Sequence, residues 1–223
     1  MPDSTSESRM CTMRLIVGPA VITLAITILR LVGELRQWSS LLFNPAAGGL
    51  GSLVGIVWLV PIFGIYFAMQ LAKAGEKAPS RWRPLGYALL GLTVVFAGGA
   101  VGYAESLHLP GKLILGYLIM AGGALVPLCA WPALGKALLA YGYAARIPVA
   151  IIMFLAMRGS WGTHYDALPP GFPPMGFWMK YVELALLPQL ILWVVYTVVV
   201  GVLFGGIVNG LAHRSTPAPT TGA

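Results

Sequence analysis

The chain has 223 residues, of which 58% are hydrophobic and only 9% are charged, and its formal net charge is +7. Soluble domains carry about 25% charged residues, so this composition excludes a soluble fold with a water-facing surface. The basic residues lie mostly between long apolar segments, where Lys and Arg set membrane orientation and meet anionic lipid. The position of the basic residues therefore indicates membrane lipid as the partner that the positive charge meets, and it does not favour nucleic acid.

The apolar segments predict an all-α fold, a polytopic transmembrane helical bundle of about six spans. Each segment is close to the roughly 20 residues that a helix needs to cross the hydrocarbon core of a bilayer. Polar and apolar residues do not alternate within the segments, as they would in the strands of a membrane barrel. In chain order the predicted spans cover residues 15–32, 50–71, 85–104, 113–131, 135–157 and 177–208.

Polar ends flank the predicted spans. Residues 1–13 and 213–223 are predicted to be disordered tails, which leaves residues 14–212 as one six-span membrane domain. A signal peptide is the alternative interpretation of the first apolar segment. Its nearly neutral start and its length, beyond the about 7–15 apolar residues of a signal sequence, favour a retained span.

A short break separates the fourth and fifth spans. Pro132, Gly135 and Lys136 supply turn-forming and polar residues there, so Arg146 falls near the middle of the fifth span. A break near residues 141–143 is the competing division, but it leaves a span too short to cross a bilayer. An intramembrane charge is costly, so Arg146 is a candidate functional residue.

Two interpretations of Arg146 remain open. As a functional residue, it holds an anionic group or pairs with Glu183, and Pro148 frees a backbone carbonyl nearby. As a structural residue, it pairs with helix carbonyls or an acid, or reaches an interface beside the hydroxyl groups of Tyr141 and Tyr143.

Two polar connections are candidates for chemistry. One contains His164, Tyr165 and Asp166, and the other contains Glu105 and His108 three residues apart. Imidazole and carboxylate groups are suitable zinc ligands, and six spans would place both connections on one membrane face. Their spacing matches no metalloenzyme motif, so the sequence predicts no cofactor, no resident metal and no catalytic residue. In the alternative interpretation, Asp166 accepts backbone hydrogen bonds and His164 is solvated.

Residue spacing within the spans indicates how the helices pack. Arg30 and Glu34 end the first span four residues apart, so we expect them to pair on one helix face. Small residues spaced four apart allow helices to approach closely and favour homo- or hetero-oligomers. Such faces contain Gly98, Gly102, Gly201 and Gly205.

The distribution of Lys and Arg predicts that both termini are cytoplasmic, in what we expect to be a bacterial inner membrane. The most basic connection covers residues 73–83 and lies on the cytoplasmic side in a six-span topology, together with Lys136. The far side then carries fewer basic residues, namely Arg30, Arg36, Lys112, Arg158 and Lys180.

The sequence favours a non-enzymatic role as a membrane partner or complex subunit. A small transporter or channel subunit with Arg146 in an intramembrane site is the first alternative. A metal-dependent membrane enzyme that uses His164, Asp166, Glu105 and His108 is the second. Nucleophilic and nucleotide-driven chemistry have no support, because the sequence contains no G-x-S-x-G motif, phosphate-binding loop or dinucleotide fingerprint.

Overall fold

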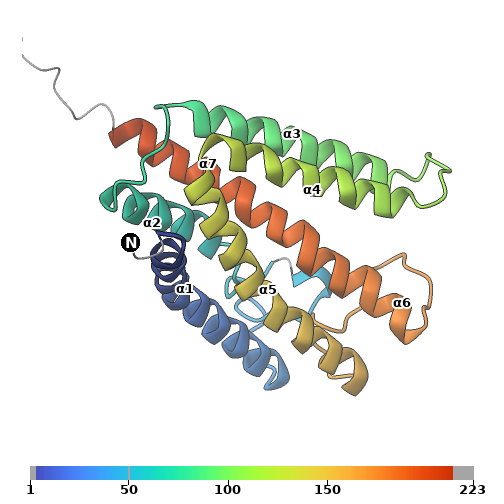
Figure 1. Ribbon diagram of the computed structural model, residues 1–223. Helices are drawn as coiled ribbons and strands as arrows, with labels where there is room; N and C mark the ends of the chain where they lie inside the picture. The colour runs from blue at the N-terminus through green and yellow to red at the C-terminus, as the bar shows by residue number, and fades with distance from the viewer. Residues whose placement is uncertain (1–3, 50, 213–223) are drawn as a thin grey trace, which may run out of the picture. The chain divides into compact units, whose positions relative to one another are not determined.

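A computed structural model describes residues 4–49 and 51–212, and every regular element within them is a helix (Figure 1). The predicted all-α fold is therefore confirmed. The long helices are α1 (Ser4–Leu35), α3 (Arg83–Tyr103), α4 (Lys112–Ala130), α5 (Pro132–Gly159) and α7 (Trp193–Ala212). The shorter ones are η1 (Ala47–Gly49), α2 (Leu59–Lys73), α6 (Phe177–Tyr181) and the π-helical stretches η2 (Val182–Leu186) and η3 (Pro188–Leu192).

Five helical stretches in the described part of the chain are long and apolar enough to cross a membrane. The second predicted span, residues 50–71, is instead represented by α2, which begins at Leu59 and has 15 residues. The chain before α2 folds back on itself, because residues 53 and 54 donate backbone hydrogen bonds to residues 41 and 42. Pro61 consequently lies in the first turn of α2, where its missing N–H costs little, and does not kink a longer helix.

The predicted break between the fourth and fifth spans is confirmed. Helix α4 ends at Ala130 and α5 begins at Pro132, so the proline occupies the first helical position, where it is well tolerated. Arg146 lies midway along α5, inside an apolar helix of 28 residues. The structure thus distinguishes the two breaks considered from the sequence: the break lies at residue 131, and Arg146 lies within a helix and not in a loop.

The structure describes most of the predicted N-terminal tail but not the predicted C-terminal tail. Helix α1 begins at Ser4, so it includes most of the segment expected to be an N-terminal tail. A helix that has formed over the apolar segment extends readily, because each added residue gains one backbone hydrogen bond. The expected C-terminal tail, residues 213–223, lies outside the described residues.

The expected membrane domain divides into two compact units. The first unit contains residues 1–59 and 140–194, and the second contains residues 60–139 and 195–223. Helix α5 and the helical stretch from α6 to α7 each contribute residues to both units. Each unit has its own interior, and the two interiors differ in polarity.

The second unit is held together by close contacts between helix backbones. Helices α3 and α4 form an antiparallel hairpin (Figure 1). A Cβ atom built on Gly116 would lie 2.6 Å from the Cα atom of Gly102 and 2.7 Å from the carbonyl oxygen of Gly98. The glycine face predicted on the third span therefore packs against α4 of the same chain.

The glycine face of α7 is also occupied within the second unit. A Cβ atom on Gly201 would meet the side chain of Leu138, and one on Gly205 would meet Leu134 and Ala68. The glycines that were predicted to lie at an oligomer interface thus contact other helices of the same chain. Small-xxx-small spacing identifies a face for close approach but does not identify the helix that approaches it.

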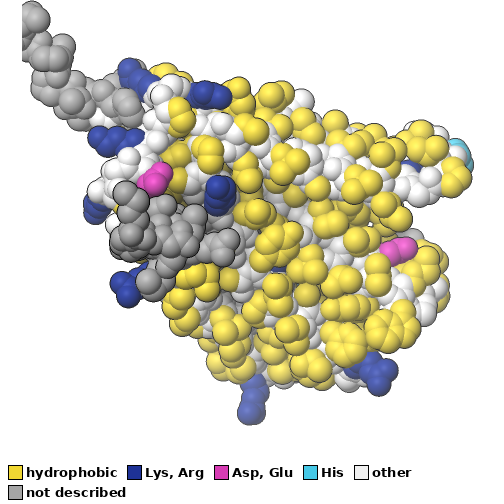
Figure 2. Space-filling view, viewed as in Figure 1, with side chains coloured by type: hydrophobic (Ala, Val, Ile, Leu, Met, Phe, Trp, Pro, Cys, Tyr) yellow, Lys and Arg dark blue, Asp and Glu magenta, His cyan; other side chains and the backbone are white. Residues whose placement is uncertain are grey.

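The first unit buries several polar side chains beside apolar ones, and it exposes many hydrophobic side chains. On α1, Thr23, Thr27, Arg30 and Glu34 are all less than 9% exposed, whereas Val21 is 60% exposed. These polar residues are spaced four, three and four apart, which places them on one side of a helix. Hydrophobic side chains also cover most of the surface seen in Figure 2. This inversion of the usual soluble pattern is what a lipid environment requires.

The contact between α1 and the connection after α5 predicts the membrane topology. Glu34, near the end of α1, bonds to His164, which follows the end of α5, so both helix ends lie at one membrane face. The chain must then cross an even number of times between them, and α3, α4 and α5 supply only three crossings. We therefore predict that α2 is the fourth crossing, although its 15 residues extend only about 22 Å.

Six crossings place both termini on one side, and we expect reporters fused at residue 1 and at residue 223 to be found on the same face. The positive-inside distribution predicts that this face is cytoplasmic. Reporters on opposite faces would show that α2 does not cross the bilayer.

Candidate functional site

The first unit contains a buried ionic network near the C-terminal end of α1. Arg30 and Glu34 lie one helical turn apart, and the Nε atom of Arg30 donates to Oε1 of Glu34 at 2.9 Å. This confirms the pair expected from the sequence. The carboxylate also accepts hydrogen bonds from the Nδ1 atom of His164 at 2.6 Å and from the backbone N–H of His164 at 2.8 Å. The Glu34 side chain has 0% exposure, so this carboxylate is enclosed by its donors.

Asp166 gives the connection after α5 the shape that brings His164 to Glu34. Its carboxylate accepts hydrogen bonds from the backbone N–H of Gly162 at 2.9 Å and from both the N–H and hydroxyl of Thr163 at 2.7 Å. Lys180 also donates to the backbone carbonyl of Asp166 at 2.6 Å, which ties the connection to α6. The expectation that Asp166 accepts backbone hydrogen bonds is confirmed. The expectation that His164 is solvated is wrong, because its side chain is only 14% exposed and is bonded to Glu34.

Burial favours the neutral form of the His164 imidazole. Burial lowers its pKa below the ordinary value, the hydrogen bond that His164 donates to the Glu34 carboxylate raises the pKa, and the nearby Arg30 charge lowers the pKa further. Because an ionised carboxylate only accepts hydrogen bonds, the hydrogen-bond network assigns the proton to Nδ1 and leaves Nε2 as an acceptor. The network therefore combines one cation, one carboxylate and one imidazole.

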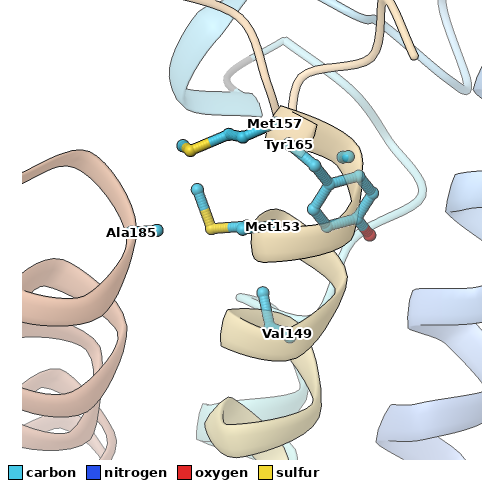
Figure 3. Close-up of a cluster of buried hydrophobic side chains, with 6 residues drawn as sticks. Val149, Met153, Met157, Tyr165 and Ala185 are labelled. Carbon is cyan, nitrogen blue, oxygen red and sulfur yellow. The ribbon is translucent and has the colours of Figure 1, made fainter. Parts of the chain in front are cut away.

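Tyr165 extends from the network into an apolar cluster. Tyr165 belongs to a cluster of buried side chains with Val149, Met153 and Met157 of α5, and Figure 3 shows Met153 and Met157 pointing toward Ala185 of η2. Its hydroxyl donates to the backbone carbonyl of Thr27 at 3.2 Å. Burial raises the pKa of Tyr165, so the hydroxyl stays protonated and remains a donor. Because Tyr165 follows His164 in the chain, the apolar cluster adjoins the ionic network.

Arg146 occupies a second polar position, in the middle of α5. It is 4% exposed, donates to Oε1 of Gln189 at 3.4 Å, and its guanidinium lies 4.7 Å from the ring centroid of Trp193. Gln189 also contacts the sulfur of Met153 at 3.5 Å, which orients its amide. Glu183, the acid suggested as a partner from the sequence, is half-buried in η2. Contacts with a neutral amide and an aromatic ring thus help to position Arg146.

The residues proposed for a metal site are divided between the two units. Glu105 and His108 follow the end of α3 at Tyr103, and the Nδ1 atom of His108 lies 3.1 Å from the carbonyl oxygen of Ser106. His164 belongs to the first unit, where it is bonded to Glu34. Across residues 4–49 and 51–212, no group of three or more His, Cys, Asp or Glu side chains is placed to hold a metal ion. The metal-dependent alternative gains no support from these residues.

Sequence reasoning placed Arg30 and Glu34 at a span end as a local pair and did not assign them to a site. The available signal was the spacing of Thr23, Thr27, Arg30 and Glu34, which gives one polar side to an otherwise apolar helix. In a membrane helix such a side faces protein or a water-filled cavity and avoids lipid.

The apolar exterior, the long hydrophobic helices and the buried charges together define an integral membrane protein of the helical type. Comparison with known protein families, curated proteins and solved structures finds no match to this chain.

Proposed function

We propose that this protein is a small-solute transporter or channel subunit whose first unit admits a small anion. The observation that carries the proposal is Arg146, a charge buried at the centre of a membrane helix and positioned by Gln189 and Trp193. Maintaining a guanidinium at this depth is expensive, and intramembrane charges of this kind line substrate or ion pathways. Gln189 and Trp193, which contact this cation, carry no charge themselves.

The charge of the interior supports an anion as the solute. Among the described residues of the first unit, the buried charged side chains are Arg30, Glu34 and Arg146. Two positive charges and one negative charge sum to +1, and burial favours the neutral form of His164. Positive side chains that line a pathway favour anions over cations.

The ionic network and Arg146 are two polar positions in the first unit, and together they suggest how the pathway is arranged. The network of Arg30, Glu34 and His164 forms a polar entrance at the membrane face, and Arg146 forms an inner position. The apolar cluster around Tyr165 adjoins the entrance, and apolar constrictions act as gates because they exclude water. A role as a non-catalytic membrane partner has less support, because the glycine faces that favoured it pack within the chain.

The test is anion flux into liposomes that contain the purified protein. Wild-type protein should increase the flux of at least one of chloride, nitrate, phosphate and acetate above that of empty liposomes. Arg146→Gln should reduce this flux at least about tenfold, because it removes the charge and retains a hydrogen-bonding side chain. Arg146→Lys should keep part of the flux, since it preserves the charge but not the planar guanidinium.

Arg36→Gln is the matched control. Arg36 is exposed just beyond α1 and loses the same charge on substitution, so flux through this variant should equal that of the wild type. Gel filtration of each variant in detergent checks that it is folded. Wild-type liposomes no more permeable to these anions than empty ones would overturn the proposal, as would full flux through Arg146→Gln.

A further inference from the structure

The second unit contains a cavity of about 280 Å³ that plays no part in the proposed pathway. Lys73, the last residue of α2, and Lys77, in the connection that follows, both line it. Trp131 lines it from the junction of α4 and α5, and Asn209 lines it from α7. The cavity therefore lies where one end of α2, the α4–α5 junction and the end of α7 meet.

Hydrogen bonds give this cavity a fixed wall. The side-chain amide of Asn209 donates to the backbone carbonyls of Ser80 and Arg81 at 3.3 Å and 3.0 Å. The Trp131 indole N–H donates to the carbonyl of Glu76 at 3.0 Å. The basic connection is thus attached at both of its ends, so the position of its lysines relative to the helices is defined.

The charges around the cavity favour an anionic ligand. Lys73 and Lys77 converge on one space, and none of the described residues that line it is acidic. Arg81 adds a third cation beside the wall: its Nε atom donates to the carbonyl of Gly210 at 3.0 Å. Its buried Nη2 atom has no hydrogen-bond partner in the described part of the chain. Cations grouped in this way repel one another unless an anion lies between them.

The rest of the lining is apolar, which selects among anions. Ala72 of α2 and Val208 of α7 belong to this apolar part. A volume of about 280 Å³ lies just below the roughly 300–1,000 Å³ of small-molecule sites, so the cavity suits a headgroup and not a whole lipid. A ligand with a phosphate at one end and hydrocarbon at the other matches both parts of the lining. Basic pockets between helices at the cytoplasmic face are also where anionic headgroups bind.

We propose that this cavity binds the phosphate headgroup of an anionic phospholipid. Lys73 and Lys77 contact the phosphate, and the start of the acyl chains lies along the apolar wall that contains Ala72 and Val208. The same surface has the charge distribution expected of a cytoplasmic face, which is adjacent to the leaflet richest in anionic lipid.

Native mass spectrometry of the purified protein in non-ionic detergent tests this proposal. Phosphatidylglycerol and phosphatidylcholine with identical acyl chains are titrated separately, and inorganic phosphate is used as a competitor. We expect one phosphatidylglycerol to be retained per chain at concentrations where phosphatidylcholine is not. The double variant Lys73→Gln/Lys77→Gln should weaken its retention at least about tenfold, because it removes both cations that contact the phosphate.

Two further variants separate a defined site from general surface charge. Lys136 is exposed near the α4–α5 junction and does not line the cavity, so Lys136→Gln should leave lipid retention unchanged. Ala72→Phe fills the cavity without changing charge and should reduce retention. If Ala72→Phe does not fold, the lysine double variant and Lys136→Gln decide the question.

Three outcomes would overturn the proposal. They are equal retention of phosphatidylglycerol and phosphatidylcholine, an equal loss in Lys136→Gln and in the lysine double variant, and displacement of the lipid by inorganic phosphate at the same concentration. The last would indicate a site for free phosphate compounds and exclude lipid as the ligand.

Discussion

Glu34→Ala should lower the free energy of unfolding by about 3–5 kcal/mol, the range for removing one partner of a buried ion pair. The Glu34 carboxylate is fully buried and accepts hydrogen bonds from Arg30 and from two groups of His164. Arg30 is only 8% exposed, and without Glu34 its guanidinium loses this anionic partner. The connection after α5 also loses its attachment to α1 through His164.

Denaturant-induced unfolding in mixed detergent micelles measures this effect. Glu76→Ala is a matched control, because Glu76 is exposed and its contact with Trp131 uses the backbone carbonyl, which the substitution retains. Its unfolding should resemble that of the wild type. A Glu34→Ala variant that unfolds within about 1 kcal/mol of the wild type would show that the network contributes little to stability.

A double-mutant cycle identifies which partner matters. His164→Ala should show a coupling energy with Glu34→Ala of roughly 1–3 kcal/mol, because the two residues share hydrogen bonds in a buried setting. Additive effects would mean that the contact between Glu34 and His164 does not account for the loss.

The sequence was sufficient to predict the helices because composition and length determine them in a membrane. Each apolar segment in a membrane must have its backbone hydrogen bonds satisfied, and a helix is the only structure other than a closed β-barrel that does so. Pro132, Gly135 and Lys136, together with the length that a span needs, were also sufficient to locate the break between α4 and α5. The placement of Arg146 inside a span follows from that break.

The second predicted span shows where hydropathy stops being informative. Residues 50–58 are as apolar as those of α2, but Gly51 has a φ of 80° and the chain pairs with residues 41 and 42. Hydropathy reports burial in an apolar medium and does not distinguish a helix from a folded connection. The boundary at Leu59 was therefore not predictable from it.

The candidate site was less predictable than the fold, because its key contact joins residues far apart in the chain. The spacing of Arg30 and Glu34 predicts their pairing, since both lie on one helix. Nothing local connects Glu34 with His164, which are 130 positions apart. Asp166 appeared as a candidate ligand for a metal, but its carboxylate instead shapes the connection that delivers His164.

Gly116→Ala should destabilise the protein by about 1–3 kcal/mol, as expected for added volume in a close-packed contact. The added methyl group would lie 2.6 Å from the Cα atom of Gly102 and 2.7 Å from the carbonyl oxygen of Gly98. Both atoms belong to the backbone of α3, so no side chain can rotate away, and the two helices must separate. Separation loses the close packing that holds membrane helices together where no hydrophobic force acts between them.

Gly122→Ala is the matched control on the same helix, because a Cβ atom at Gly122 meets nothing within 4 Å. Alanine has the better helix propensity, so this variant should equal the wild type or gain up to about 1 kcal/mol. Thermal unfolding of both variants in one detergent measures the difference. Equal stability of the two would mean that α3 and α4 do not approach closely at Gly116. Greater stability of Gly122→Ala would instead assign the predicted glycine face of α3 to its neighbour α4, which leaves that face closed to a partner protein.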